Sequence, residues 1–289
     1  MKTELELSTG PIVVGTDFSP AAQAVIAYAA DLAILESRSL HLVHVMQIVS
    51  EDSPDLVEVQ TDTLQENVTA MAAILKKSGV KADGELVIGT AAHELVHIAN
   101  RLHASYLVVG SEGHSGLDRL VLGSVAEGVI RKSNRPVLIV GPQAVKQAKK
   151  TLPWKHIILA CDTAKGVTEA AQLAGSIALS HAARLTIFHV KKDGLDSIPE
   201  DQFELMEKMM SREAWLTIKP QCLIRAGDPA KEILRILEDS RADLLILSVQ
   251  PEGQLSTHLR SGIIAKVLRL ARSPVMVLRN LEHRLPHGA

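Results

Sequence analysis

Aromatic side chains are scarce in this chain of 289 residues, because Phe, Trp and Tyr together make up only 2% of the sequence. Hydrophobic residues nevertheless make up 46%, so the core has to be built from Ala, Val, Leu and Ile. This apolar content, together with 22% charged residues, is typical of a globular protein with a substantial core. A chain of this length is expected to form two domains of ordinary size.

An excess of one charge sign is also missing, since the formal net charge is −2. The one local basic cluster, Lys146, Lys149 and Lys150, is typical of a solvated linker. A nucleic-acid partner is therefore not expected, because such proteins carry a strongly basic face.

Long apolar runs and a recognisable leader are absent as well. No apolar run approaches 18 residues, and MKTELELSTG at the start does not resemble a signal peptide. The two cysteines, Cys161 and Cys222, each lie in an apolar, strand-like run, which favours buried thiols in a reducing compartment. We therefore expect a cytoplasmic protein without a membrane partner.

The sequence contains an internal repeat. IVVGTDFS at 12–19 is similar to IILACDTA at 157–164, and GTAAHELVHIANRLHASYLVVG at 89–110 is similar to GDPAKEILRILEDSRADLLILS at 227–248. Such self-similarity is the signature of a repeated structural unit. The repeat predicts two domains of one fold, and a polar, Lys-rich segment between two prolines marks the boundary. The predicted domains are residues 1–142 and 153–280.

Each copy alternates short apolar runs with longer segments of helical periodicity. In the first copy the apolar runs predict buried strands at 12–16, 40–46, 85–88, 106–110 and 137–140. The intervening segments predict helices at 20–36, about 59–78, 91–103 and 123–133, with Ser19 and Thr90 as N-caps. This alternation predicts an α/β fold in which helices cover both faces of a doubly wound, five-stranded parallel sheet. In such a fold the ligand site lies at the carboxyl ends of the strands.

The stretch HELVHIANRLH, residues 93–103, is similar to the zinc signature of metalloproteases. On one continuous helix, however, His93 and His97 lie opposite the apolar stripe, and His103 lies well away from them. The second copy has Lys or Arg at all three positions, as solvent-facing positions allow. We therefore predict a polar helix face and no catalytic zinc, while weak surface binding of a metal by His93 and His97 stays open.

A different constellation occupies VVGSEGHSGLDRLVLGSVAEGVI, residues 108–130. Gly110 and Gly113 follow the fourth predicted strand, and Gly123 with Ser124 opens the next helix. Glycines let backbone N–H groups approach an anion, and a helix start presents unpaired N–H groups and a positive dipole end. The pattern predicts a phosphate site, with ordinary loop glycines as the alternative.

The spacing G-x2-G-x9-G-S resembles the ATP-binding motif of the universal stress protein family. GTDFS at 15–19, LVHV at 42–45 and SNRPVLIV at 133–140 resemble the first, second and last strands of that family. The resemblance covers nearly the whole chain, once for each copy. It implies a tandem member with strand order 3-2-1-4-5 in each domain, the Rossmann-like arrangement of adenine nucleotide alpha hydrolase-like proteins.

The resemblance also implies a binding site for ATP, ADP or AMP, with Mg²⁺, at the carboxyl ends of the first and fourth strands. Asp17 would contact the adenine and Val45 would pack near it. The ribose and phosphates would be held by Gly110, Gly113, Gly123, Ser124 and Val125. Independently of the family, Asp17 follows a strand beside the point where the strand order reverses, although a helix-capping role is the alternative.

The second copy departs from this pattern. Asp162 and Val190 are retained, but the four glycine and serine positions become Ser248, Pro251, Ser261 and Gly262. Proline removes an N–H and fixes φ where the loop should surround phosphate. We therefore predict one nucleotide site per chain, in the first domain.

Residues suited to phosphoryl transfer are few. The segment 110–124 has no Lys, Arg119 is its one strong cation, and Glu112, His114 and Asp118 are its polar candidates for holding metal or water. We expect binding without catalysis and assign no catalytic residue, with slow ATP hydrolysis as an alternative.

The leading functional hypothesis is a stress protein in which ATP orders the 110–123 loop and changes a surface that partners bind. The alternatives are an interaction or scaffold module without nucleotide, and an enzyme, either a weak ATPase or a zinc hydrolase. The last strands, 137–140 and 275–278, are expected at sheet edges, which are normally paired or covered. In the family related edges pair domains, which implies an intrachain pseudo-dimer and leaves a homodimer open.

Overall fold

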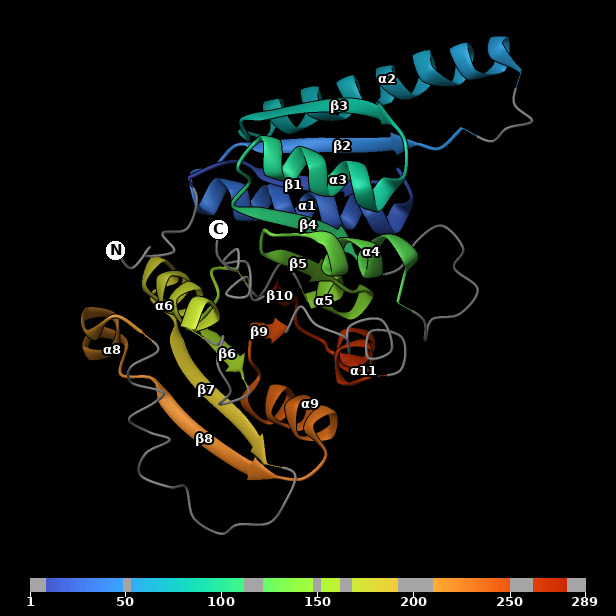
Figure 1. Ribbon diagram of the computed structural model, residues 1–289. Coiled ribbons are helices and arrows are strands. Elements are labelled where there is room, and N and C mark those ends of the chain that lie inside the picture. The colour runs from blue at the N-terminus through green and yellow to red at the C-terminus, as the bar shows by residue number, and fades with distance from the viewer. Residues whose placement is uncertain are drawn as a thin grey trace, which may run out of the picture. The chain divides into compact units, whose positions relative to one another are not determined.

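The computed structural model of the chain (Figure 1) divides into two compact units, residues 8–145 and a second unit made chiefly of residues 146–289. They are called the first and second domains below. The residues that the structure describes are 9–48, 53–111, 122–147, 152–161, 168–191, 210–249 and 262–279.

Strands and helices alternate through the first domain. The elements are β1 (Ile12–Thr16), α1 (Pro20–Leu35), β2 (Leu40–Met46), α2 (Pro54–Lys77), β3 (Ala82–Ile88), α3 (Ala91–Arg101), β4 (Tyr106–Gly110), α4 (Ser124–Lys132), β5 (Val137–Val140) and α5 (Pro142–Gln147). All pairings among the five strands are parallel, in the order β3-β2-β1-β4-β5. The predicted strand order of 3-2-1-4-5 is confirmed.

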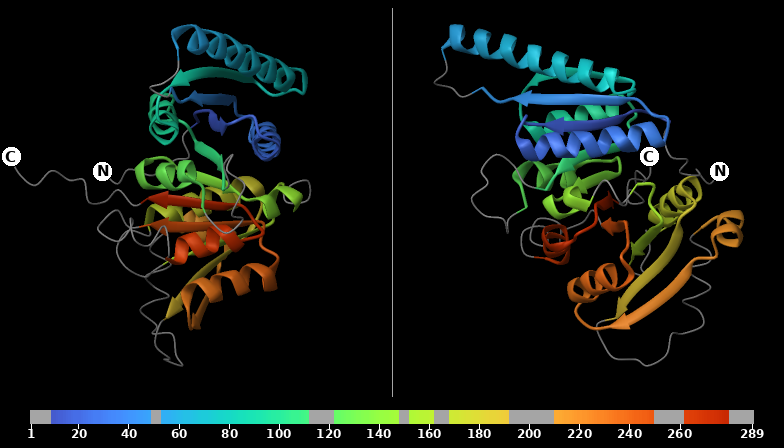
Figure 2. Two further views of the ribbon diagram at one scale, coloured as in Figure 1. Left: turned by 90° about the vertical axis from the view of Figure 1, so that its right-hand side faces the viewer. Right: turned by 180° about the vertical axis from the view of Figure 1, so that it is seen from behind.

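Burial on both faces explains why the strand sequences show little alternation. All four residues of β5 and four of the five in β1 are buried, as expected of a parallel sheet covered on both sides. Figure 2 shows α1 on one face of this sheet and α3 on the other. Both helices begin directly after a strand, so their N-termini lie at the carboxyl edge of the sheet.

The second domain repeats this architecture. Its elements are β6 (His156–Ala160), α6 (Thr168–His181), β7 (Arg184–Lys191), α8 (Arg212–Ile218), β8 (Gln221–Ala226), α9 (Pro229–Ser240), β9 (Leu244–Val249), α11 (Ile263–Leu270) and β10 (Val275–Arg279). Its five strands are parallel in the order β8-β7-β6-β9-β10, the counterpart of the first domain's order. The fold class predicted from the repeat is therefore confirmed for both copies.

Three predicted boundaries were wrong by two residues or more. α2 begins at Pro54, five residues earlier than predicted, because Ser53 caps it and Pro54 fits its first turn. β3 begins at Ala82 and includes Asp83 and Gly84, which no apolar pattern would mark as strand. α3 ends at Arg101, because His103 adopts a left-handed backbone with φ of 50° where the chain turns toward β4.

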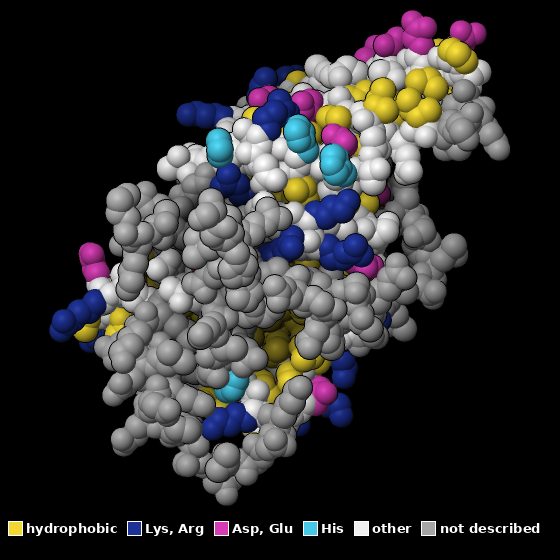
Figure 3. Space-filling model, in the orientation of Figure 1, with side chains coloured by type: hydrophobic (Ala, Val, Ile, Leu, Met, Phe, Trp, Pro, Cys, Tyr) yellow, Lys and Arg dark blue, Asp and Glu magenta, His cyan; other side chains and the backbone are white. Residues whose placement is uncertain are grey.

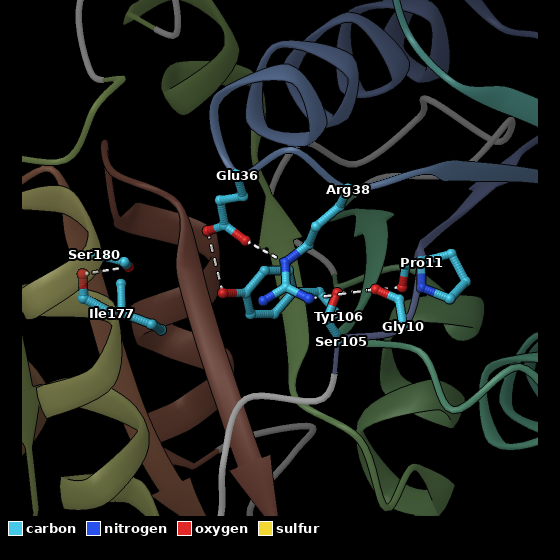
Figure 4. A network of polar contacts seen from close by, with 8 residues as sticks. All are labelled: Gly10, Pro11, Glu36, Arg38, Ser105, Tyr106, Ile177 and Ser180. Carbon is cyan, nitrogen blue, oxygen red and sulfur yellow. Dashed lines mark hydrogen bonds and ion pairs between the residues drawn. The ribbon is translucent and has the colours of Figure 1, made fainter.

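A polar network ties the end of α1 to the start of β4 (Figure 4). Glu36 accepts a hydrogen bond from Arg38 Nε at 2.8 Å and one from the Tyr106 hydroxyl at 3.2 Å. The Arg38 guanidinium also lies 5.8 Å from the centroid of the Tyr106 ring. Burial, and next the charge of Glu36, raise the pKa of Tyr106 well above its ordinary value, so the hydroxyl stays a donor.

Candidate functional site

Asp17 directly follows β1 at the carboxyl edge of the first domain's sheet. Its Oδ1 accepts a hydrogen bond from the Ser19 N–H at 2.9 Å, and Phe18 between them has a left-handed backbone with φ of 60°. Ser19 is the N-cap of α1, since its hydroxyl accepts from the Ala22 N–H at 3.1 Å. The helix-capping position therefore belongs to Ser19, and the half-buried Asp17 lies in the turn before it.

His44, on β2, holds this turn from the neighbouring strand. Its Nδ1–H donates to the Thr16 carbonyl at 2.8 Å, and its ring stacks on Phe18 with centroids 4.8 Å apart. The second domain repeats the arrangement, with His189 Nδ1 donating to the Cys161 carbonyl at 2.9 Å. His44 was not among the predicted site residues, although the histidine shared by LVHV at 42–45 and IFHV at 187–190 marks this position in both copies.

The two ends of the glycine-rich segment meet at the same edge. β4 ends at Gly110, and the carbonyl of the next residue, the buried Ser111, accepts a hydrogen bond from the Gly123 N–H at 2.9 Å. The Ser111 N–H in turn donates to the Val140 carbonyl at 3.3 Å. The strand exit and the start of α4 are thus joined through the backbone.

The N-terminus of α4 lacks a capping side chain. Its N-cap is Gly123, which makes no side-chain hydrogen bond to the helix, and Ser124 is exposed at the first position. Unpaired N–H groups at such a helix start, together with the helix dipole, favour an anion. Glu127 lies in the first turn, where its carboxylate is 3.9 Å from Arg131, which offsets part of its charge.

Strand register brings the predicted residues to one edge. Thr16 pairs with His44, so Asp17 and Val45 come next on neighbouring strands, and Val45 is half-buried. Gly110 lies at the end of β4, the neighbour of β1 on its other side. The hydrogen bond from the Gly123 N–H to the Ser111 carbonyl brings Gly123 to the same edge, and Ser124 and the half-buried Val125 come next along the chain. Gly113, like Glu112, His114, Asp118 and Arg119, lies outside the described residues, and the assignment of the site residues stays a prediction.

In the second domain, the helix that corresponds to α4 starts at a different position. α11 begins one alignment position later than α4, at Ile263, with Gly262 as its N-cap. Ser248 is half-buried within β9, and Val190 is half-buried near the end of β7. Asp162, Pro251 and Ser261 lie outside the described residues.

The histidines of residues 93–103 do not converge. His93 and His97 are both exposed on α3, as the helical periodicity predicted, and His93 Nδ1 lies 3.0 Å from Glu94 Oε1. His103 lies beyond the helix, where its Nδ1 accepts from Arg135 Nη2 at 2.9 Å. Within the described ranges, no three His, Cys, Asp or Glu side chains gather as a metal site would require.

A surface pocket of the first domain lies at the opposite end of the strands. It is lined by Ser39, Lys76, Gly79, Val80, Lys81, Ala82 and Asp83. These residues lie around the start of β2 and β3, so this pocket is separate from the candidate site at the carboxyl edge.

A family model described as the universal stress protein family matches residues 9–141 and again residues 153–279. The chain belongs to the universal stress protein family. It is a tandem member, because one family unit follows another along the chain.

One relative of the same length and one of about half the length support this assignment. Universal stress protein Rv2005c of Mycobacterium tuberculosis is 26% identical over 295 residues, covering 93% of this chain and 96% of the relative. Universal stress protein MJ0531 of Methanocaldococcus jannaschii is 31% identical over 136 residues, covering 45% of this chain and 80% of the relative.

A solved structure of the same length shares the fold. The crystal structure of a universal stress protein from Archaeoglobus fulgidus has a TM-score of 0.74 at 21% identity, covering 95% of this chain and 97% of that one. No helix in the described part of this universal stress protein has the length and apolar character needed to cross a membrane.

Proposed function

We propose that the first domain binds an adenine nucleotide, ATP or its products ADP and AMP, at the carboxyl edge of its sheet. The observation that carries this proposal is the hydrogen bond from the Gly123 N–H to the Ser111 carbonyl. It holds the uncapped start of α4 beside the end of β4, next to the turn that contains Asp17. A phosphate group can therefore meet backbone N–H groups while the base reaches a carboxylate on the next strand.

The residues present fit such a ligand. Ser124 is exposed and can donate its hydroxyl, and Gly123 places no side chain over the first turn of α4. Asp17 keeps its carboxylate half-buried, with Oδ1 accepting the Ser19 N–H, and it can accept a hydrogen bond from an adenine amino group. Mg²⁺ would enter with the phosphates, which carry the negative charge that it neutralises.

The proposed role is regulation by binding. A nucleotide that contacts both the end of β1 and the start of α4 binds best to the conformation in which these two elements are the right distance apart. Nucleotide binding therefore increases the fraction of molecules in that conformation. We propose that partners recognise this form during stress. Efficient phosphoryl transfer is not proposed, because the loop offers no lysine for the γ-phosphate, and any hydrolysis would be slow.

The second domain is proposed to bind no nucleotide with comparable affinity. Its helix α11 starts one position later, so the N-terminal N–H groups are displaced along the helix by one residue relative to α4. Pro251, where the first domain has Gly113, has no N–H to offer. The pairing of the two domains as a pseudo-dimer is a further proposal, supported by the short apolar last strands β5 and β10.

Calorimetric titration of the full chain with ATP and Mg²⁺ tests the proposal, because it gives the stoichiometry as well as the affinity. We expect one nucleotide per chain. The variant Gly113→Pro copies the second domain and should weaken binding at least about tenfold. Gly262→Ser, which changes the N-cap of the second domain's α11, is the matched control and should leave the affinity unchanged.

The titration has outcomes that would contradict this proposal. Absence of binding by the unmodified chain would support the interaction module without nucleotide. Two nucleotides per chain, or equal loss of affinity in Gly262→Ser, would overturn the assignment to the first domain. Release of phosphate at a rate comparable with ordinary kinases, about 1 per second or faster, would show that the protein is an enzyme after all.

A further inference from the structure

Helix α2 is much longer than the sheet it covers. Its 24 residues span about 36 Å, whereas the seven residues of the neighbouring strand β3 span about 23 Å. The buried residues of α2, Val68, Ala72 and Leu75, all lie in its C-terminal half. Thr61 still contacts Met46, the last residue of β2, at 3.7 Å, and the turns of α2 before Thr61 project past the carboxyl ends of β2 and β3, as Figure 1 shows.

A second apolar stripe runs along the exposed side of α2. It consists of Leu56, Val59, Thr63, Ala70 and Ile74, all exposed, with Val59 at 63% and Ile74 at 56%. Spacings of three, four, seven and four residues place these side chains on one face, as in a coiled-coil seam. At 100° per residue this stripe is centred about 150° from the buried face, so it points away from the first domain's core.

Charge is divided between the two halves of α2. The N-terminal half carries Asp55, Glu58 and Asp62, Glu66 follows at the middle, and the only basic residues of the helix are Lys76 and Lys77 at its C-terminus. In Figure 3, acidic side chains cover the projecting tip of α2, apolar side chains gather behind them, and basic side chains lie toward the other end.

We propose that this stripe is a dimer interface between two copies of the chain, formed by antiparallel pairing of their α2 helices. Antiparallel pairing about a two-fold axis near the middle of the stripe places Asp55 of each helix beside the partner's Lys77, because at 100° per residue both residues lie on the same flank of the stripe. Both ends of the pair are then complementary, and the exposed apolar side chains toward each end of the stripe are covered. A parallel pair would instead set acidic half against acidic half.

The same features select a second copy over other occupants. The acidic residues beside the stripe repel an anionic membrane surface, which attracts basic helices. Thr63 and Ala70 are small and allow the two backbones to approach closely near the middle of the helix. Asn67 lies beside the seam between them, and one neutral polar residue at such a place fixes the register of a helix pair.

Sedimentation velocity of the full chain from about 1 µM to about 1 mM tests this interface. We expect a monomer–dimer equilibrium that Val59→Glu weakens at least tenfold, because it places a charge in the seam among acidic neighbours. Leu216→Glu is the matched control: Leu216 is 59% exposed on α8 of the second domain, and its change should leave the equilibrium unaltered.

Exchanging charges between the two ends of α2 distinguishes this antiparallel interface from a dimer formed through another surface. Lys77→Glu should weaken the dimer, and adding Asp55→Lys should restore it at low salt, because these two positions face each other across the antiparallel pair. Circular dichroism confirms that each variant is folded, and these exposed positions should tolerate the changes. A chain that stays monomeric to the highest concentration, or a dimer indifferent to Val59→Glu and to the charge exchange, would overturn the proposal. The outcome does not depend on nucleotide binding.

Discussion

The strained turn before α1 should depend on His44. Phe18 holds a left-handed backbone that costs a non-glycine residue about 1 kcal/mol or more, and His44 supplies both a hydrogen bond and a ring contact that favour it. The change His44→Ala removes both. Asp17, between Thr16 and Phe18, should then lose its fixed position without being altered itself.

The magnitude follows from the two contacts. The hydrogen bond at 2.8 Å contributes about 1 kcal/mol, and the stacked pair with centroids 4.8 Å apart about another 1 kcal/mol. We expect the free energy of unfolding of the first domain to fall by about 2 kcal/mol. In His44→Ala, ATP binding has to restore the turn. We therefore expect the affinity for ATP to fall about tenfold, which corresponds to about 1.4 kcal/mol of binding free energy.

His189→Ala is the matched control, because His189 makes the equivalent hydrogen bond to Cys161 in the second domain. Unfolding is followed by far-UV circular dichroism for both domains and by tryptophan fluorescence for the second, since Trp154 and Trp215 are the chain's two tryptophans. Affinity is measured by calorimetry at a temperature where every variant is folded.

The expected pattern is a loss of stability in both variants and a loss of ATP affinity in His44→Ala alone. Unchanged affinity in His44→Ala would mean that the histidine only stabilises the domain and does not position Asp17. Equal loss of affinity in both variants would refute the assignment of the site to the first domain.

Three further predictions test the packing and the titration of single residues. Tyr106→Phe should lower stability by about 1 kcal/mol, measured by urea denaturation, because Glu36 loses a hydrogen bond from a buried hydroxyl. Gly128→Ala should destabilise the first domain by about 1–3 kcal/mol, since a Cβ there would lie 2.6 Å from the Ala92 Cβ, and adding Ala92→Gly should recover most of the loss. Burial lowers the pKa of His156 below 6.5, so the unfolded chain binds the proton first as the pH falls. The second domain should therefore lose stability as the pH falls below about 6.5, by tryptophan fluorescence, and His156→Gln should reduce that slope.

The sequence predicted the fold where burial dominates. β1, β2, β4 and β5 occupy the predicted ranges, because strands buried on both faces require nearly continuous apolar runs. The start of β3 could not be found this way, since its first residues include Asp83 and Gly84 on a less covered edge strand. The first turn of α2 was missed for a related reason, because none of residues 54–58 is buried and only Val57 among them is half-buried.

The candidate site was predictable only in part. Glycine spacing and strand order indicated the edge, but nothing in the spacing shows that the Ser111 carbonyl and the Gly123 N–H meet, because that contact joins residues from different elements. The position of His44 was marked by the histidine that both copies share, but its role was not, because its partner is a backbone carbonyl on another strand, a group that every residue type carries.

The bond between Ser111 and Gly123 also has a consequence for how this protein can vary. It joins the residue that follows β4 to the residue that precedes α4, so the two ends of the intervening segment are held together. Closing a longer loop costs little extra free energy, about 0.6 kcal/mol for each doubling of its length. Insertions and deletions between these two residues should therefore leave the strands and α4 in place, so the length of this segment can change and alter ligand specificity without a change of fold.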